Sequence, residues 1–480
     1  MLEKTNLIIE KLKQETNNLS DIIYREKIIN KKKVYIIYNE PLTSSDKISD
    51  FIIRSLNNIQ NKKSKNLVET ISNDISNFKY KKISTYKDLC SFLHKGFTII
   101  LVDGEKEGFA LETKGDIKRG ISTPDTEFSV RGSKDAFVED YQTNIGLIKK
   151  RIKTNNLWIE QVSIGRSTET QIGVVSIHNI VKKELVECVL EKIKKIDIDG
   201  IINSDILKNL IEKENKNAFP TVLTTERPDM VSKSLLEGKV VIMVDNSPFA
   251  IIIPAVLNDF FKTGEDTYGK SINVSFTRMI KYLAFFIALL TPAVYIAIIT
   301  YNQEMIPTDL LVSFAIQRDG VPFPAFFEAI IMMIAFEILR ESDLRVPSSS
   351  GSALSIVGAL ILGDAAVSAG IVSPIMIIVI AITAISSLPF TESDFINALR
   401  WYRFLFMIGS SVLGIIGILI VFIYFLTKLS STKSFGKPYL IPFVPTFKEG
   451  LKNSIIRFPL KKLNKRRSYL SDNIIKENDK

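Results

Sequence analysis

The residues of this sequence that point most specifically to a chemical role are carboxylates inside apolar stretches. Asp364 is the only charged residue between Val346 and Thr391. Transferring an ionised carboxylate into hydrocarbon is costly, so a lone one normally faces water or the interior of a helix bundle. Asp364 is therefore predicted to line a pore or its vestibule. The alternative is a side chain that snorkels from a helix end or stays neutral.

Two further carboxylates, Glu328 and Glu337, belong to the apolar segment 323–339. Nine residues of an ideal helix turn through about 900°, which places the two side chains on opposite sides. A lipid-exposed spanning helix does not carry carboxylates on both sides cheaply. We therefore interpret 323–339 as an interfacial or re-entrant helix, and we keep both glutamates as pore or gating candidates.

Small residues recur near Asp364 at the spacing of one helix face. Glycine and alanine at every fourth position let helices approach closely in a membrane. This predicts a tightly packed, oligomeric bundle, and the alternative is packing within one monomer. The set that joins Asp364 as pore or gating candidates is Ser355, Ala359 and Gly363. A second small face is formed by Ser410, Gly414 and Gly417.

The sequence contains few residues that are suited to catalysis or to metal binding. His94 and His178 are the only histidines, and Cys90 and Cys188 have no CxxC spacing. Such a set favours neither a zinc site nor a disulfide framework. The sequence also contains no phosphate-binding loop, no HExxH and no visible nucleophile with a base. We predict no enzyme, no metal site and no cofactor.

The charge of the chain is concentrated in its C-terminal tail. The formal net charge is +10 for 480 residues, and residues 428–480 hold 13 Lys or Arg against 4 Asp or Glu. A basic segment directly after an apolar span is typical of a cytoplasmic flank that contacts anionic lipid. A nucleic-acid binder carries its charge on a folded face instead, so nucleic acid is not an expected partner.

Long uncharged runs follow a mixed-charge first half. The runs 282–303, 365–391 and 404–427 match or exceed the roughly 20 residues that cross a bilayer. No signal-peptide pattern opens the chain, so both termini are expected in the cytoplasm, with an even number of crossings. Pro292 lies inside the first span, where neighbouring groups can satisfy the carbonyl that it frees. The four predicted spans cover 280–301, 352–371, 374–390 and 404–427.

Strands that alternate with amphipathic helices precede these runs. This pattern predicts an α/β soluble N-terminal region of two subdomains, followed by an all-α polytopic membrane domain. The predicted bounds are 1–120 and 121–262 for the subdomains, 263–278 for a connector, 279–428 for the membrane domain and 429–480 for the basic tail. Helices are expected within 1–30, in pieces over 42–92, and over 134–153, 181–196, 205–213 and 230–236. Strands are expected over 33–38, 96–102, 109–113, 158–164, 171–177, 239–244 and 249–253.

Two charged clusters are candidate interfaces. In the sequence ERPD, Arg227 and Asp229 could hold a subdomain junction by charge-assisted hydrogen bonds, or Asp229 could cap the next helix. The cluster at the membrane edge could form an intersubunit salt-bridge ring or an interfacial solvated face, and its members are Arg340, Glu341, Asp343 and Arg345.

Several longer motifs occur together in this chain. They are TPDTEFSVRGSKDAFVEDYQTNIGLIKKRI (123–152), FPTVLTTERPDMVSKSLLEGKVVIMVDNSPFAIIIPA (219–255), GVPFPAFFEAIIMMIAFEILRESDLRVP (320–347), SIVGALILGDAAVSAGIVSP (355–374) and SFGKPYLIPFVP (434–445). Over roughly 96–446 the chain resembles the A-subunit family of spore germinant receptors (GerA type). Matching signature positions that we take as interface candidates are Arg131, Glu226, Arg227, Asp229, Arg340, Glu341 and Arg345.

The resemblance implies a function and partners. It implies two α/β subdomains and a membrane domain in the spore inner membrane. It also implies a homo-oligomer, a pentamer, that forms a cation channel and opens when nutrient binds a transporter-like B subunit, with a lipoprotein C subunit as third component. The family usually has Gln or Glu where this chain has Asp364. A secondary transporter and a non-conducting scaffold stay open as alternatives, although no internal repeat supports a transporter.

Overall fold

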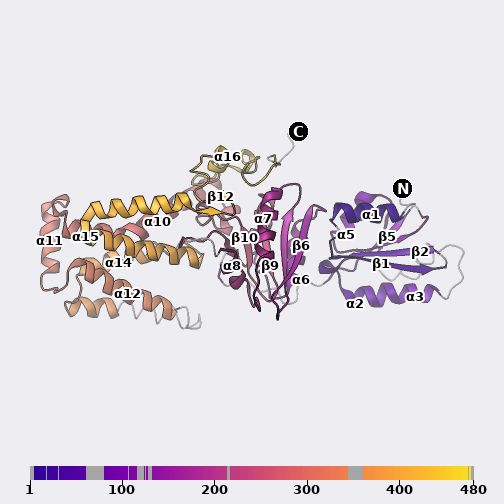
Figure 1. Cartoon of the computed structure of the whole chain (residues 1–480), viewed down its shortest axis with the longest axis horizontal. Helices are drawn as coiled ribbons and strands as arrows, with labels where there is room; N and C mark the ends of the chain where they lie inside the picture. Colours follow the sequence, from indigo (N-terminus) through magenta and orange to yellow (C-terminus); the bar gives the residue numbers. More distant parts are fainter. Residues whose placement is uncertain are drawn as a thin grey trace.

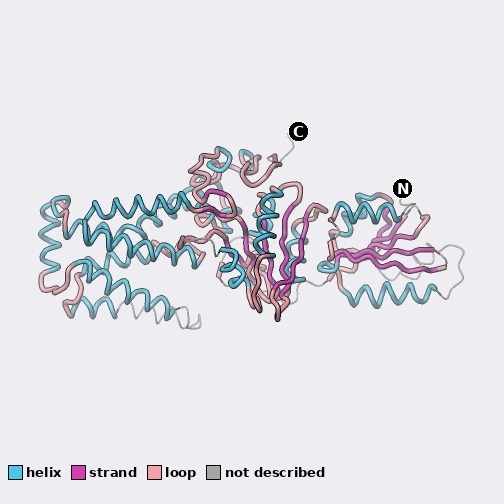
Figure 2. The backbone as a smooth tube through the Cα atoms, viewed as in Figure 1, coloured by secondary structure: helices cyan, strands magenta, loops and turns pink. Residues whose placement is uncertain are grey.

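In a computed structural model, two α/β subdomains and a helical bundle follow one another along the long axis of the molecule (Figure 1). Figure 2 shows strands concentrated in the two subdomains and long helices at the opposite end. The fold class predicted from the sequence is thereby confirmed. The structure describes residues 5–17, 19–30, 32–60, 80–105, 107–115, 124, 126–127, 132–212, 217–343, 361–473 and 475–476.

Subdomain 1 is an antiparallel five-stranded sheet, in the order β1-β2-β4-β5-β3, with helices on both faces. Alternate residues of β2 face opposite sides, because side chains alternate along a strand. Ile36 packs with α3 and its neighbours, and Ile37 packs with α1 and α5. The elements are α1 (Thr5–Glu15), β1 (Ile22–Ile29), β2 (Lys32–Asn39), η1 (Glu40–Leu42), α2 (Ser45–Lys47), η2 (Ile48–Ile53), α3 (Arg54–Gln60), β3 (Tyr80–Ile83), α5 (Tyr86–Leu93), β4 (Thr98–Val102) and β5 (Gly108–Leu111).

Subdomain 2 repeats this architecture with the strand order β6-β7-β9-β10-β8. Helices α6 and α9 cover one face of the sheet, and α7 and α8 cover the other. The elements are α6 (Tyr141–Arg151), β6 (Leu157–Ile164), β7 (Thr170–Ile177), α7 (Lys183–Lys194), α8 (Ser204–Glu212), β8 (Leu223–Thr225), α9 (Pro228–Leu236), β9 (Val240–Val244) and β10 (Ala250–Ile253). The connector then holds η3 (Leu257–Asp259) and η4 (Gly264–Thr267).

Two described segments of the bundle are long and apolar enough to cross a membrane, namely Ser271–Thr300 and Ser393–Ser431, the second of which is divided at Gly414. Helix Pro374–Ile385 is apolar but shorter. The elements of the bundle are α10 (Ser271–Thr300), η5 (Gln303–Met305), α11 (Thr308–Arg318), α12 (Ala325–Asp343), α14 (Pro374–Ile385) and α15 (Ser393–Ser431).

The chain reverses direction inside α15, at Gly414. In a straight helix Tyr402 and Phe425 would lie about 35 Å apart, yet their ring centroids are 4.9 Å apart. Gly414 has φ 60° and ψ −135°, and a Cβ there would lie 2.8 Å from the Cβ of Tyr301. The single span predicted over 404–427 is therefore wrong, because its two halves are antiparallel arms of a helical hairpin.

Helix α12 runs lengthwise along the bundle (Figure 1). Near its start the carboxylate of Glu328 binds Ser373, which caps α14. Near its end Glu337 lies 3.0 Å from Arg400 of α15. Both carboxylates therefore have polar partners within the bundle, and the interfacial or re-entrant placement of 323–339 stays a prediction.

The basic tail folds back on the soluble part. Arg278 of α10 donates to the carbonyl of Ser454 at 2.9 Å, and Arg457 donates to the carbonyl of Gly269 at 2.9 Å. Figure 1 shows the tail beside subdomain 2 and the start of α10. Its elements are β11 (Lys433–Ser434), β12 (Lys437–Pro438), α16 (Lys448–Leu451) and η6 (Leu460–Lys462).

Candidate functional site

A buried lysine joins the soluble region to the bundle. Lys208 of α8 lies 2.9 Å from Glu392 and 2.5 Å from Asp394, at the N-terminus of α15. Its side chain is only 5% exposed. Burial lowers the pKa of Lys208, but the attraction of Glu392 and Asp394 outweighs it, so the pKa is raised and the amine stays charged. The hydroxyl of Thr224 also donates to Glu392 at 2.9 Å.

This joint was not predicted from the sequence. Lys208 occupies an ordinary position of an amphipathic helix, and Glu392 lies in a short loop. Carboxylates at a helix start are common because they interact favourably with the helix dipole. Only the fold brings together residues that are 184 positions apart.

The ERPD sequence forms a second junction. The carboxylate of Glu226 accepts from the backbone and hydroxyl of Thr126 at 2.6 and 2.8 Å. Arg227 is 2% exposed and donates to Asp229 at 2.8 Å, and Tyr268 of the connector donates to the same carboxylate at 2.7 Å. Helix α9 starts at Pro228 with Arg227 as its N-cap residue, so Asp229 lies inside the first turn. The cluster ties subdomain 2 to the connector that leads into α10.

A carboxylate in this second junction has a strongly shifted pKa. Burial raises the pKa of Glu127 to about 7. The hydroxyl of Thr225 and the charge of Arg227 oppose this rise. Arg131 falls outside the described residues.

The predicted pore candidates occupy different parts of the bundle. Glu328 is fully buried, accepts hydrogen bonds from Ser373 and forms an ion pair with Arg318, which lies 3.1 Å away. Glu337 pairs with Arg400 at 3.0 Å and with Arg340 at 3.5 Å. The two glutamates therefore hold helices together at separate points instead of sharing one site.

The remaining candidates have fewer described contacts. Asp364 and Glu341 are exposed, whereas Gly363 is buried. A Cβ at Gly363 would lie 3.5 Å from Ile377 of α14, so this position packs closely against its neighbour. Outside the described residues lie Ser355, Ala359 and Arg345.

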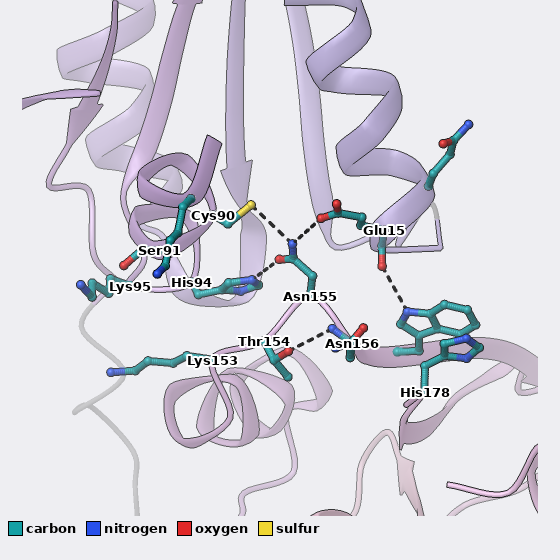
Figure 3. Close-up of a pocket in the computed structure, with 13 residues that line it drawn as sticks. Glu15, Cys90, Ser91, His94, Lys95, Lys153, Thr154, Asn155, Asn156 and His178 are labelled. Carbon is teal, nitrogen blue, oxygen red and sulfur yellow. Dashed lines mark hydrogen bonds between the residues drawn. The ribbon is translucent and has the colours of Figure 1, made fainter. Parts of the chain in front are cut away.

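A cavity of about 820 Å³ lies where the two subdomains meet (Figure 3). The amide of Asn155 donates to Glu15 at 3.0 Å and to the Sγ of Cys90 at 3.4 Å, and it also bonds His94. Burial raises the pKa of the Cys90 thiol and lowers the pKa of His94. The cavity has the size and mixed polarity that suit a small polar molecule.

The opposite wall of this cavity is aromatic, and a buried ion pair lies close by. Trp158 stacks on His178 with ring centroids 3.6 Å apart. Lys149 of subdomain 2 lies 2.9 Å from Asp21 of subdomain 1, and both side chains are at most 5% exposed. Burying a charged pair is costly unless it is well bonded, and the amide oxygen of Asn39 gives Lys149 a second acceptor at 3.1 Å.

Comparisons with known proteins show which family the chain is similar to. The family described as Bacillus/Clostridium GerA spore germination protein matches residues 10–469. The chain is 41% identical to spore germination protein KA of Bacillus subtilis (strain 168), over 94% of this chain and 84% of that protein. It is 34% identical to the uncharacterised membrane protein YfkQ of the same organism, over 94% of this chain and 88% of that protein.

A solved structure is also similar. The crystal structure of the N-terminal domain of the A subunit of the Bacillus megaterium spore germinant receptor GerK3 shares 32% identity. It covers 53% of this chain and 96% of that domain, with a TM-score of 0.42. On the family match and the identity to protein KA, the chain belongs to the GerA family of spore germination proteins.

Proposed function

We propose that this chain is the A subunit of a nutrient germinant receptor and forms a ligand-gated channel for monovalent cations. The observation that carries the proposal is the burial of charged side chains among apolar helices, with Glu328 at 0% exposure and Arg403 at 2%. Ionisable groups inside a membrane bundle are expensive and typically mark an ion pathway or its gate. The Lys208 joint supplies a rigid link by which a soluble event reaches that bundle.

The proposed assembly follows the resemblance of the motifs. Copies of the chain form a pentamer in the spore inner membrane, together with the nutrient-binding B subunit and the lipoprotein C subunit. Helix α1 and the tail element α16 both lie outside the bundle, on the side of the soluble subdomains (Figure 1), which supports cytoplasmic termini and an even number of crossings. Exposed tail lysines, among them Lys461, Lys462 and Lys465, are the groups proposed to contact anionic lipid.

Reconstitution tests this function. The A, B and C subunits are incorporated into potassium-loaded liposomes, and nutrient is expected to start downhill potassium efflux. An intact complex that binds nutrient but releases no potassium would leave a non-conducting scaffold. Uptake against a gradient would instead establish a secondary transporter. Liposomes that hold only the B and C subunits provide the control.

A further inference from the structure

A buried arginine and a helix-interior proline meet inside the bundle. We propose that Arg403 of α15 supplies the hydrogen bond that Pro292 removes from α10, and that this bond locks α15 against α10 in the resting bundle. The bond itself is independent of conduction. Its role as a gate rests on the proposed channel function.

The first step concerns Pro292 and the carbonyl of Ala288. In an α-helix the N–H of each residue donates to the carbonyl four residues earlier, and proline has no N–H. Pro292 therefore leaves the Ala288 carbonyl without its helical donor. Ala288 is fully buried and Pro292 is buried as well. An unsatisfied carbonyl in such surroundings is costly, so a donor from a neighbouring helix would be stabilising.

The second step is the identity of that donor. The Nε of Arg403 lies 2.7 Å from the Ala288 carbonyl oxygen, the distance of a strong charge-assisted hydrogen bond. Nη1 of the same guanidinium lies 3.4 Å from the Sδ of Met333 on α12. One side chain of α15 therefore contacts two other helices, α10 and α12, from a position that is only 2% exposed.

The third step concerns the charge of Arg403. Glu337 lies one turn beyond Met333 on α12, but its carboxylate is within ion-pair distance of Arg340 and Arg400. Among the described residues, no carboxylate lies within ion-pair distance of Arg403. The groups that Arg403 contacts directly are neutral, and Glu337 attracts it only from beyond ion-pair distance, so the buried charge is incompletely compensated. The hydrogen bond of the lock is short, but burying the positive charge of Arg403 is costly. This combination suits a contact that must hold at rest and release on a signal.

The fourth step connects the lock to the soluble region. Arg403 lies eleven residues after Glu392, the N-cap residue of α15, which is about 16 Å along a rigid helix. Glu392 and Asp394 are held by Lys208 of α8. A displacement of α8 would therefore reach the Arg403 contact through one continuous helix.

The test is a suppressor experiment on the complete receptor in liposomes. Arg403→Met keeps the bulk of the side chain but removes the donors, and Pro292→Ala restores the helical N–H. Loss of one buried, charge-assisted hydrogen bond corresponds to about a tenfold change in an equilibrium. We expect Arg403→Met to raise nutrient-independent potassium flux about tenfold, and Pro292→Ala/Arg403→Met to return it to within about twofold of Pro292→Ala alone.

A second readout separates the lock from conduction. Amide hydrogen exchange of α10 around Ala288 is expected to rise in Arg403→Met and to fall back in the double variant. Arg400→Met is the matched control, since Arg400 bonds Glu337 and Pro292→Ala cannot compensate for its loss. If every sample including the unmodified receptor fails to conduct, the channel proposal fails while the exchange data still judge the lock.

Two outcomes would overturn the lock. One is equal flux and equal exchange in Arg403→Met with and without Pro292→Ala, because the Ala288 carbonyl would then not be what Arg403 serves. The other applies if Arg403→Met does not assemble. The proposal then requires Pro292→Ala to recover assembly, and a double variant that also fails to assemble contradicts it.

Discussion

At the scale of single residues, Lys208 carries the link between the two halves of the molecule. Lys208→Met leaves Glu392 buried without its cation, and removing one partner of a buried ion pair costs about 3 kcal/mol. We expect a matching fall in the free energy of unfolding of the full chain in detergent, and a loss of nutrient-triggered flux. Arg166→Met is the control, because the Arg166–Asp197 pair is 67% and 69% exposed and should contribute little. Equal effects of both substitutions would contradict the proposed link.

At the scale of elements, the sequence predicts helices and strands that have regular apolar spacing, but it does not predict which distant elements contact one another. Leu185, Val189 and Ile193 recur on one helical face, and all three are buried in α7. Strand β1 was missed because the YREK run at its centre gives no apolar alternation; it is a half-exposed edge strand. The joint at Lys208 and the Arg403–Ala288 bond were also missed, since each depends on which distant helix lies opposite.

The hairpin in α15 shows which helices one set of small residues brings together. Small residues at Ser410, Gly414 and Gly417 predict close helix packing, either between copies of the chain or within one monomer. The structure uses Gly417 for close approach to Gly409 on the other arm of the same hairpin, and Gly414 makes the turn. Sequence spacing indicates that helices come close, but it does not say whether the partner helix is the next one along the chain.

Gly414 can be tested directly. Its φ of 60° is in the left-handed region, and an added Cβ would collide with Tyr301. We expect Gly414→Ala to lower the free energy of unfolding by about 3 kcal/mol. Gly436→Ala is the control, with a φ of 78° and no atom within 4 Å of the added Cβ; it should cost about 1 kcal/mol. If the two substitutions lower the free energy of unfolding equally, the turn at Gly414 is not tightly packed against Tyr301.

At the scale of the whole molecule, the tail closes the structure on itself through Arg467. This side chain lies 3.2 Å from Asp259 and 3.4 Å from Glu237, beside the soluble end of the bundle. Burial works to raise the pKa of Glu237, but Arg467 and neighbouring lysines lower it to about 2. A carboxyl whose pKa is lowered by folding stabilises the folded protein at pH values above its pKa in the unfolded chain, about 4.3. This stabilisation is lost as the pH falls toward 2.

Acid should therefore weaken the attachment of the tail in a way that depends on Arg467. We expect the thermal unfolding midpoint of the full chain in detergent to decrease as the pH is lowered from 4.5 to 2. We expect Arg467→Met to lower the midpoint at pH 7. The same variant should also show a smaller decrease of the midpoint with acid. The smaller decrease follows because Glu237 loses the cation that depresses its pKa. Arg457→Met is the matched control, since Arg457 donates to the carbonyls of Gly269 and Thr267 and removes no partner of a carboxylate. If the midpoint decreases equally with acid in both variants, the contact of Arg467 with Glu237 does not attach the tail to the soluble region and the start of the bundle.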